Sequence, residues 1–238
     1  MNLLLLRDDD FVEGGAARLT GRRLLHAREV LRAAQGDAFR VGRLGGGVGV
    51  GEVISLTESE LVLRCDLEEL PPARPGVDLL LAMPRPKALR RILPAAAALG
   101  VDRIVLVNSA RVEKSYFDSH VLAQVEDLLV LGLEQARDTR LPQVAVRERF
   151  RPFVEDELER AFPPALRLLA HPAAERAASP VEGRIVLAIG PEGGWVPFEV
   201  KLLEQHGFEP FTLGPRPLRV EVALPYALGR LVSGAAAP

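Results

Sequence analysis

Two glycine-rich segments near the end of the chain have the composition of ligand-binding loops. Residues 188–195, AIGPEGGW, follow one apolar run, and residues 213–219, LGPRPLR, follow another. Glycine has no side chain, so main-chain N–H and C=O groups in such loops can approach a flat ligand such as adenine closely. The alternative is that such a loop is only a tight connection between a strand and a helix. That explanation suffices for one loop, but it explains two less well. We therefore predict a binding site built from both segments.

The glycine spacing argues against two familiar phosphate-binding patterns. Residues 190–194 contain neither the Gly-Lys-Ser/Thr ending of a P-loop nor the Gly-x-Gly-x-x-Gly of a dinucleotide fold. A third stretch, GGGVGVG at residues 45–51, has no helix after it to supply free main-chain amides, so we interpret it as a hairpin turn. Nucleotide phosphates are therefore poor candidates for the ligand.

Few side chains near these loops could transfer a proton. Glu192 is expected to cap the following helix or to fix its loop rather than to act as a base. His171 is a residue type that transfers protons near neutral pH, but we expect it to fix the AHP loop at residues 170–172. Trp195 could stack on a base, although packing is the stronger expectation. The four histidines (26, 120, 171 and 206) and Cys65 lack ligand spacing, so no metal site is predicted.

The segments that would position these loops alternate between strands and helices. We expect strands at residues 77–82, 104–108, 166–170, 184–189 and 211–213, and helices at 87–99, 119–137, 197–206 and 221–232. Continuously apolar strands separated by helices predict a parallel sheet covered on both faces, an α/β domain over residues 77–238. In such sheets ligands bind at the carboxyl ends of the strands, where all three loops are expected.

The first part of the chain has a different pattern. Short alternating strands are expected at residues 39–41, 49–56 and 60–67, with one helix at residues 21–34 that Thr20 would cap. The sequence PPARPG at residues 71–76 cannot continue either type of element, so it is interpreted as a linker. The predicted organisation is a small domain over residues 1–70, the linker, and the α/β domain.

Positive charge is concentrated in the first domain. The whole chain has a formal net charge of −2, yet residues 18–43 contain seven arginines (18, 22, 23, 28, 32, 40 and 43) against Glu29 and Asp37, a local excess of 7 − 2 = +5. Such a patch is typical either of a phosphate-binding surface or of a solvated helix face, and the pattern leaves both open. The candidate phosphate contacts are Arg22, Arg23 and Arg32 of this patch, with Arg85 and Lys87 after the first strand of the later domain.

Bulk features indicate a protein of a reducing compartment. The single cysteine excludes an intramolecular disulfide framework. The short leucine run at the start lacks the basic region and cleavage site of a signal peptide, and no apolar stretch approaches 18 residues. We therefore expect a cytoplasmic protein without a membrane span.

The two late segments resemble paired motifs of the RsmE family of 16S ribosomal RNA methyltransferases, IGPEGG-x-x-x-x-E and LG-x-x-I-L-R-x-E-T-A. Residues 189–194 and Glu199 match the first motif. The second is matched by Leu213, Gly214, Arg216, Leu218, Arg219, Glu221 and Ala223. Weaker similarity extends over nearly the whole chain, including HAREVLRAAQGDAF, MPRPKALRRILPAAAALGVDRI and LEQARDTRLP. The chain departs from the family pattern at Pro94, Ala98, Asp138, Pro217, Val220 and Val222.

The resemblance implies a SPOUT-class enzyme that methylates N3 of a uridine in 16S rRNA of the small ribosomal subunit, using S-adenosyl-L-methionine. It further implies an α/β SPOUT fold with a C-terminal trefoil knot at about residues 166–231, a PUA-like RNA-binding β-barrel before it, and a homodimer. The implied cofactor-binding residues are Leu169, Ala170, His171, Pro172, Ile189, Gly190, Pro191, Glu192, Gly193, Gly194, Leu213, Gly214, Leu218 and Arg219.

Methyl transfer to N3 requires positioning and stabilisation of a uridine anion rather than a covalent nucleophile. Arg219 is the candidate for that electrostatic role or for holding a phosphate near the target base, with a salt bridge to Glu221 or Glu192 as the alternative. Two other functions stay open at this point. One is an RNA-binding protein that keeps the fold without turnover, and the other is an unrelated α/β enzyme with a nucleotide cofactor.

Overall fold

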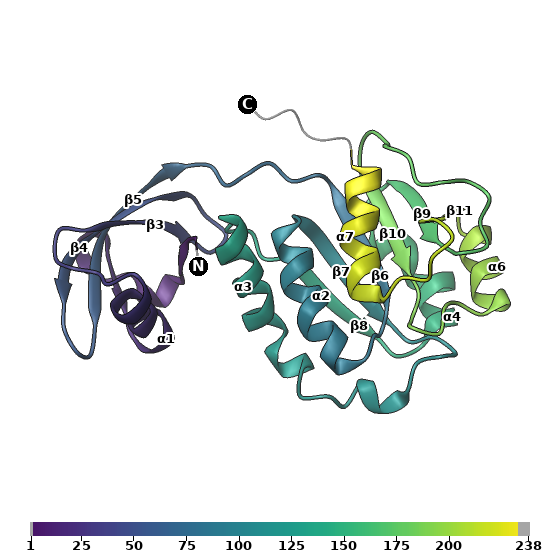
Figure 1. Cartoon of the computed structure of the whole chain (residues 1–238), viewed down its shortest axis with the longest axis horizontal. Helices are drawn as coiled ribbons and strands as arrows, with labels where there is room; N and C mark the ends of the chain where they lie inside the picture. The colour runs from purple at the N-terminus through teal and green to yellow at the C-terminus, as the bar shows by residue number, and fades with distance from the viewer. Residues whose placement is uncertain (1, 233–238) are drawn as a thin grey trace. The chain divides into compact units, whose positions relative to one another are not determined.

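The computed structural model describes residues 2–232, and contacts within the chain divide it into two compact units. The first consists of Met1–Ala73 with Val130–Leu141, and the second of Arg74–Leu129 with Pro142–Pro238. Each unit has a β-sheet of its own (Figure 1).

The first unit is built on a five-stranded sheet in the order β1-β3-β4-β5-β2. Its strands are β1 (Leu4–Leu6), β2 (Ala16–Leu19), β3 (Ala38–Arg43), β4 (Val48–Leu56) and β5 (Leu61–Glu69). The pair β1–β3 is parallel and the other pairs are antiparallel. Buried side chains such as Leu6, Val41 and Leu63 form its core together with Leu24 and Ala27 of the helix. Three of these strands were expected, whereas β1 and β2 were not.

The helix predicted at residues 21–34 is shorter and less regular than expected. Helix α1 (Gly21–Leu25) continues as one π-helical segment, His26–Val30. Arg32 then adopts a left-handed conformation with φ of 53°, and the Ala33 N–H donates to the Ala27 carbonyl at 2.9 Å. This arrangement ends the helix at Val30, four residues earlier than predicted.

The glycine-rich stretch at residues 45–51 forms a turn only in its first half. The Gly46 N–H donates to the Arg43 carbonyl at 2.8 Å, but Gly49 already lies within β4. A Cβ at Gly49 would lie 1.8 Å from the carbonyl oxygen of Asp66, so this glycine permits close approach of neighbouring strands.

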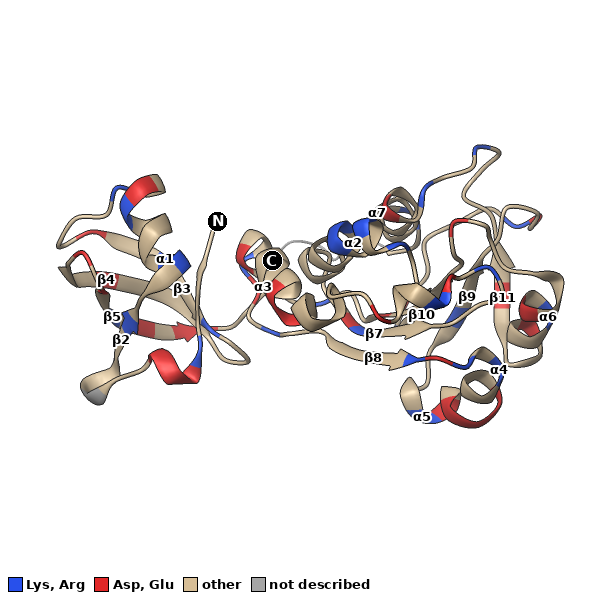
Figure 2. Cartoon of the chain, turned by 90° about the horizontal axis from the view of Figure 1, so that it is seen from below, with Lys and Arg blue, Asp and Glu red and all other residues tan. Residues whose placement is uncertain are grey.

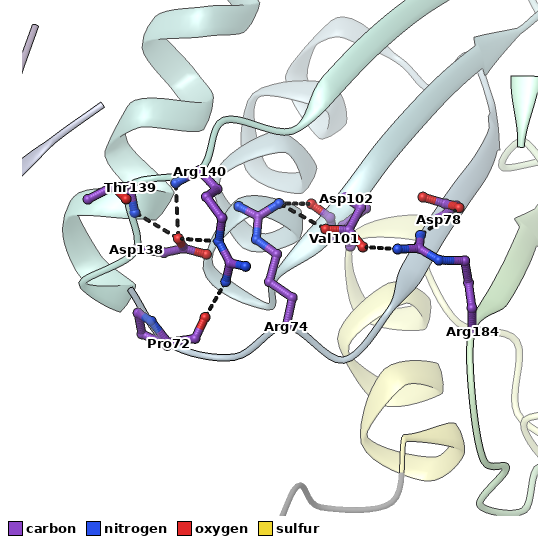
Figure 3. A network of polar contacts seen from close by, with 9 residues as sticks. All are labelled: Pro72, Arg74, Asp78, Val101, Asp102, Asp138, Thr139, Arg140 and Arg184. Atoms are coloured by element: carbon purple, nitrogen blue, oxygen red, sulfur yellow. Dashed lines mark hydrogen bonds and ion pairs between the residues drawn. The ribbon is translucent and has the colours of Figure 1, made fainter. Parts of the chain in front are cut away.

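Residues of the segment Val130–Leu141 contact the first unit, although the sequence analysis placed them in the later domain. The Thr139 hydroxyl donates to the Gly46 carbonyl at 2.5 Å, and the Asn2 N–H donates to the Glu134 carbonyl at 3.1 Å. Arg140 links Asp138 to the carbonyl of Pro72 (Figure 3).

The second unit is built on a six-stranded parallel sheet in the order β11-β9-β10-β6-β7-β8. Its strands are β6 (Val77–Ala82), β7 (Val101–Val107), β8 (Gln143–Arg147), β9 (Leu166–Ala170), β10 (Ile185–Ile189) and β11 (Phe208–Phe211). Every residue of β6 and β10 is buried, as expected for a sheet covered on both faces. The predicted α/β class is confirmed; β8 was not predicted, and β11 ends where a strand was expected to begin.

Helices cover both faces of this sheet. They are α2 (Pro86–Ala98), α4 (Phe150–Pro152), α5 (Leu158–Ala161), α6 (Pro197–Gln205) and α7 (Val220–Leu231), with a π-helical segment, Phe153–Glu157, between α4 and α5. Helix α3 (Val125–Ala136) has its first residues in the second unit and the rest in the first, and it starts six residues later than predicted. Helices α2 and α7 pack against each other on one face, with α4 and α5 on the other (Figures 1 and 2).

An ion-pair network lies at the amino-terminal edge of the parallel sheet (Figure 3). Arg184 donates to Asp78 and to Asp102, each at 2.9 Å, and Arg74 donates to Asp102 at 3.2 Å. Asp78 is completely buried, its Oδ1 atom has no hydrogen-bond partner, and burial raises the pKa of this carboxyl group although Arg184 opposes the shift. In the described part of the chain, no helix is long and apolar enough to span a membrane.

Candidate active site

Three loops meet at the carboxyl edge of the parallel sheet because β11, β9 and β10 are neighbours. Ala170 pairs with Ile189 on one side and with Phe211 on the other, so these strands end side by side. The loops that follow enclose a cavity of about 370 Å³. It is lined by Arg111, Ala170, His171, Pro172, residues 189–195, Leu213, Gly214, Arg216, Pro217, Leu218, Val220 and Ala223.

The cavity contains every residue expected to bind a cofactor except two. Leu169 is fully buried in the interior of β9, where it packs in the core between the sheet and its helices. Arg219 is exposed at the residue before α7 and does not line the cavity. The remaining expected residues are thus brought together, although their roles stay predictions.

The loop after β10 is tight, and its glycines allow it to pack closely against neighbouring groups. The Gly194 N–H donates to the Pro191 carbonyl at 2.8 Å, and Gly194 has a φ of 73°. A Cβ at Gly190 would lie 3.1 Å from ring atoms of Trp195. At Gly193 it would lie 3.0 Å from Cδ of Arg111. Side chains at these positions would therefore displace the loop or its neighbours.

Glu192 joins this loop to the start of α2. Its Oε1 atom accepts a hydrogen bond from the main-chain N–H of Arg85 at 3.0 Å, and Arg85 is the residue that precedes α2. The carboxylate does not cap the helix that follows it in sequence. This contact fits the loop-fixing role expected for Glu192.

Glu199 makes the most extensive polar contacts near the cavity. It is only 3% exposed, and its carboxylate accepts hydrogen bonds from the Ala110 N–H at 2.7 Å, the Val196 N–H at 3.0 Å and the Ser109 hydroxyl at 3.2 Å. The trailing acid of the first motif therefore ties the start of α6 to the turn after β7.

That turn carries Arg111, a cavity residue that the sequence analysis missed. The guanidinium of Arg111 donates to the carbonyl oxygen of Gly193. The available sequence signal was weak: a basic residue a few positions after an apolar strand, in a loop expected at the carboxyl edge of the sheet.

The other two loops are held by local hydrogen bonds. Nδ1 of His171 accepts from the Ala173 N–H at 3.3 Å, a contact that fits the expected loop-fixing role. The Gly214 N–H donates to the Thr212 hydroxyl at 3.1 Å, and Gly214 has a φ of 108°.

Arg219 does not form either of the salt bridges considered for it. Glu221 instead lies 3.6 Å from Arg91, and Glu192 accepts from the main chain of Arg85. The Arg219 carbonyl accepts hydrogen bonds from Val222 and Ala223, so its main chain begins helix α7.

Trp195 packs, as expected, rather than presenting an open face for a base. It is 5% exposed, and its ring lies 5.6 Å from that of Phe150, at an angle of 42°. Its Nε1–H borders the cavity and has no hydrogen-bond partner within the described chain. Because a buried N–H without a partner is costly, this donor favours occupation of the cavity by a polar ligand.

Some of the candidate RNA contacts already form ion pairs within the chain, whereas others are exposed. Arg22 pairs with the buried Glu134 at 3.2 Å; burial raises the pKa of Glu134, and Arg22 opposes the shift. Arg23 bonds Asp10 at 2.6 Å and the Leu5 carbonyl at 2.9 Å. Arg32, Arg85 and Lys87 are exposed.

The basic patch of the first unit is therefore largely compensated, which favours the interpretation of a solvated, ion-paired surface. Figure 2 shows that this unit carries both basic and acidic residues. Its carboxylate partners form the pairs Arg18–Glu60, Arg22–Glu134, Arg23–Asp10, Arg40–Glu69 and Arg43–Asp8. Among the residues that the structure describes, no group of three or more His, Cys, Asp or Glu side chains could hold a metal ion.

A parallel sheet with a loop-lined cavity at its carboxyl edge defines an α/β ligand-binding protein, and known proteins give the class more closely. Residues 72–232 match the family model for an RNA methyltransferase domain. The chain is 32% identical over 233 residues to ribosomal RNA small subunit methyltransferase E of Treponema pallidum (strain Nichols), a match that covers 94% of this chain and 87% of the relative. It is 30% identical over 240 residues to the protein of that name from Synechocystis sp., a match that covers 96% of this chain and 76% of the relative.

The chain belongs to the family of ribosomal RNA small subunit methyltransferase E, as its paired motifs predicted. Two solved structures share its fold. A Legionella pneumophila protein in complex with the bound cofactor SAM superposes with a TM-score of 0.78 at 23% identity, covering 96% of this chain and 95% of that one. A ribosomal RNA small subunit methyltransferase E from Neisseria gonorrhoeae bound to S-adenosyl methionine superposes with a TM-score of 0.75 at 22% identity. This match covers 96% of this chain and 95% of that one.

Proposed function

We propose that the protein transfers a methyl group from S-adenosylmethionine to N3 of a uridine in 16S rRNA of the small ribosomal subunit. The observation that carries the proposal is the meeting of both family motifs at one cavity, within a chain that belongs to the family. The relatives' names specify the small-subunit RNA. The uridine and its N3 position rest on the motif resemblance.

The cavity suits the methyl donor in size and in chemistry. Its volume of about 370 Å³ falls within the range of pockets that hold small ligands. Residues 190–194 and Gly214 line the cavity with little side-chain bulk, and the Nε1–H of Trp195 is an unused donor. When bound there, the donor supplies a methyl group on a positively charged sulfur.

The chain contributes positioning and electrostatics. The acceptor N3 must lose its proton to solvent, after which the new N–C bond forms as the C–S bond breaks and its electron pair stays on sulfur. Placing the two reactants in line and stabilising the negative charge on the base supply most of the rate enhancement in such a step. Glu192 and His171 hold loops, so we assign neither as a general base.

Arg219 and the exposed cations near α2 are the proposed RNA contacts of the second unit. Arg219 lies between the cavity residues Leu218 and Val220 with its own side chain exposed, a position that suits an RNA phosphate better than the cofactor. Arg85 and Lys87 are exposed at the start of α2, beside the loop that Glu192 holds. Arg32 is the remaining candidate in the first unit.

The finer architecture belongs to the same proposal. We propose that residues 1–70 form a PUA-like RNA-binding domain, that residues 71–76 are a linker, and that residues 77–238 form a SPOUT domain with a trefoil knot. The parallel strand order and the late position of the cavity loops support the SPOUT assignment. The final residues, 233–238, lie outside the described structure. A cytoplasmic location follows from the proposed substrate.

Helix α7 supports the proposed homodimer. Val222 and Tyr226 are exposed and lie four residues apart on helix α7, so they form an apolar stripe on one side of the helix, and the exposed Leu218 precedes it. Val222→Glu is expected to dissociate the dimer, which sedimentation velocity measures; an unchanged dimer would remove this stripe from the interface.

One observation favours an RNA-binding protein without turnover as the second candidate. The family resemblance implies threonines on both sides of Glu221, where this chain has Val220 and Val222. Val220 is buried against the cavity, so one hydroxyl group is missing from the wall. This candidate predicts RNA binding without methyl transfer. The third possibility, an unrelated nucleotide-dependent enzyme, is excluded by the family membership.

The direct test incubates the protein and labelled S-adenosylmethionine with small ribosomal subunits, or with free 16S rRNA, from a strain that lacks the gene. Nucleoside analysis should then reveal 3-methyluridine at one position. Gly190→Val is the matched inactive control, because the added side chain meets Trp195. RNA binding with no methylated nucleoside would favour the second candidate.

A further inference from the structure

Arg111 reaches the cavity from a part of the chain that neither family motif includes. It follows β7, and its guanidinium donates to the carbonyl oxygen of Gly193 in the loop after β10. It is also one of the residues that line the cavity. The contact joins two loops that are 82 positions apart in the sequence.

The main chain around Arg111 is fixed by buried polar contacts. Glu199 accepts from the Ala110 N–H at 2.7 Å and from the Ser109 hydroxyl at 3.2 Å. The Val112 N–H donates to the Ser109 carbonyl at 3.0 Å, which closes a turn around the arginine. Because Glu199 lies in the first turn of α6, the turn and the 190–194 loop are held by the same element.

The charge of Arg111 is not compensated within the described chain. Its hydrogen-bond partner is a neutral carbonyl, and no carboxylate of a described residue forms an ion pair with it. A guanidinium carries five N–H donors in a planar fork, so most of them are available to a ligand. The arginines of the first unit differ, because most of them are paired with carboxylates.

Gly193 makes room for this side chain. A Cβ at Gly193 would lie 3.0 Å from Cδ and 3.3 Å from Cβ of Arg111. A side chain at position 193 would therefore crowd Arg111, whose own side chain would have to shift by a few tenths of an ångström.

The exposure of these residues indicates which reactant Arg111 meets. Arg111 and Gly193 are exposed, whereas Trp195 and Val220, on the inner wall of the cavity, are buried. The arginine thus stands at the outer rim, where RNA must arrive. On the same loop, Glu192 accepts from the main chain of Arg85, so two arginines flank residues 192–193.

We propose that Arg111 binds an anionic oxygen of the RNA acceptor nucleotide at the rim of the cavity. The inference rests on the proposed function. Two oxygens share this chemistry: a phosphate oxygen next to the target nucleotide, and a carbonyl oxygen of the base, which gains negative charge when N3 loses its proton to solvent. Arginine suits both because its fork donates parallel hydrogen bonds to oxygens and keeps its charge.

The test compares Arg111→Ala and Arg111→Lys with the control Arg151→Ala, whose exposed side chain pairs with Glu155 four residues later. Three quantities are measured: RNA affinity over a range of salt, the single-turnover rate at saturating RNA, and the affinity for S-adenosylmethionine without RNA. Thermal unfolding checks that each variant is folded.

Two results support the proposal and distinguish its two oxygens. For a phosphate, Arg111→Ala should lower RNA affinity about tenfold and reduce the slope of log K against log salt by about 0.7 to 0.9, with partial rescue by lysine. For the base oxygen, the single-turnover rate should fall about 10²- to 10³-fold while RNA affinity and its salt slope stay unchanged. Cofactor affinity stays within about threefold of wild type in both cases.

Gly193→Ala gives an independent check. Its methyl group crowds the Arg111 side chain, so at saturating S-adenosylmethionine it should change the same RNA quantity as Arg111→Ala in the same direction. The two substitutions together should change that quantity no more than Arg111→Ala alone, because both act on the same contact.

Other results would overturn the proposal. If all three quantities match the wild type, Arg111 does not contact the RNA. If cofactor affinity falls tenfold or more, the arginine serves the methyl donor or the loop instead. A wild-type protein that methylates no RNA would contradict the proposed function itself, a result distinct from an active wild type with an unaffected variant.

Discussion

The carboxylate of Glu199 lies 2.7 Å from the main-chain nitrogen of Ala110, although 89 positions separate the two residues. Through this contact the last residue of the first family motif holds a turn that the motif does not include. The buried carboxylate also accepts from Val196 and Ser109, so both of its oxygens are used.

Glu199→Gln is expected to destabilise the protein by about 2 to 3 kcal/mol. Glutamine keeps only one acceptor oxygen, and its NH₂ group would point at an N–H or O–H group that now donates to the carboxylate. Urea denaturation measures the loss. The control is Glu204→Gln on the same helix, whose side chain is exposed and which should change stability by less than about 0.5 kcal/mol. Equal effects at both positions would contradict the role given to Glu199.

Glu192 allows a test between loop fixing and base catalysis. Glutamine can still accept the hydrogen bond from the Arg85 N–H, so Glu192→Gln should retain methyl transfer within a few-fold. Glu192→Ala removes the acceptor and should lower cofactor affinity about tenfold. Steady-state kinetics over a range of pH provide the measurement. A loss of about 10³-fold in Glu192→Gln, with a flattened pH profile, would identify the carboxylate as a base instead.

Part of this architecture could be predicted from the sequence because its signals are local. The apolar runs of β6 and β10 identify fully buried parallel strands, and glycine and proline after β10 identify a tight loop. The α/β class and most of the cavity wall follow from these features.

Other features depend on contacts between distant residues. Arg22 pairs with Glu134, 112 positions away, so the local excess of arginine in the sequence overestimates the free positive charge. Residues 130–136 continue an apolar helix and residues 137–141 follow it, and nothing local indicates that this segment belongs to the first unit. Arg111 likewise becomes a site residue only once Gly193 lies beside it.

The two neighbouring arginine candidates of the first unit should behave differently. Arg23 bonds a mostly buried Asp10, so Arg23→Ala should cost about 2 to 3 kcal/mol of stability by leaving that carboxylate unpaired. Arg32→Ala, at an exposed position, should leave stability unchanged and flatten the salt dependence of RNA binding. Denaturation and RNA titration on both variants test this. An unchanged salt slope for Arg32→Ala would remove it from the RNA site.

Asp78 should make stability depend on pH. Because burial raises the pKa of Asp78 in the folded state above that of the unfolded chain, the folded protein keeps this proton at pH values where the unfolded chain has lost it. The wild type should therefore gain stability relative to Asp78→Asn as pH falls from neutrality through the folded pKa. Urea denaturation at several pH values measures the difference, and a difference independent of pH would contradict the prediction.

A structure of the protein soaked with S-adenosylmethionine tests the central claim most directly. The account predicts that the methyl donor occupies the cavity between residues 190–194 and the loop at Leu213, Gly214 and Leu218, with a polar ligand atom near the Nε1 atom of Trp195. A donor bound elsewhere on the chain, or a cavity still empty at saturating donor, would contradict it.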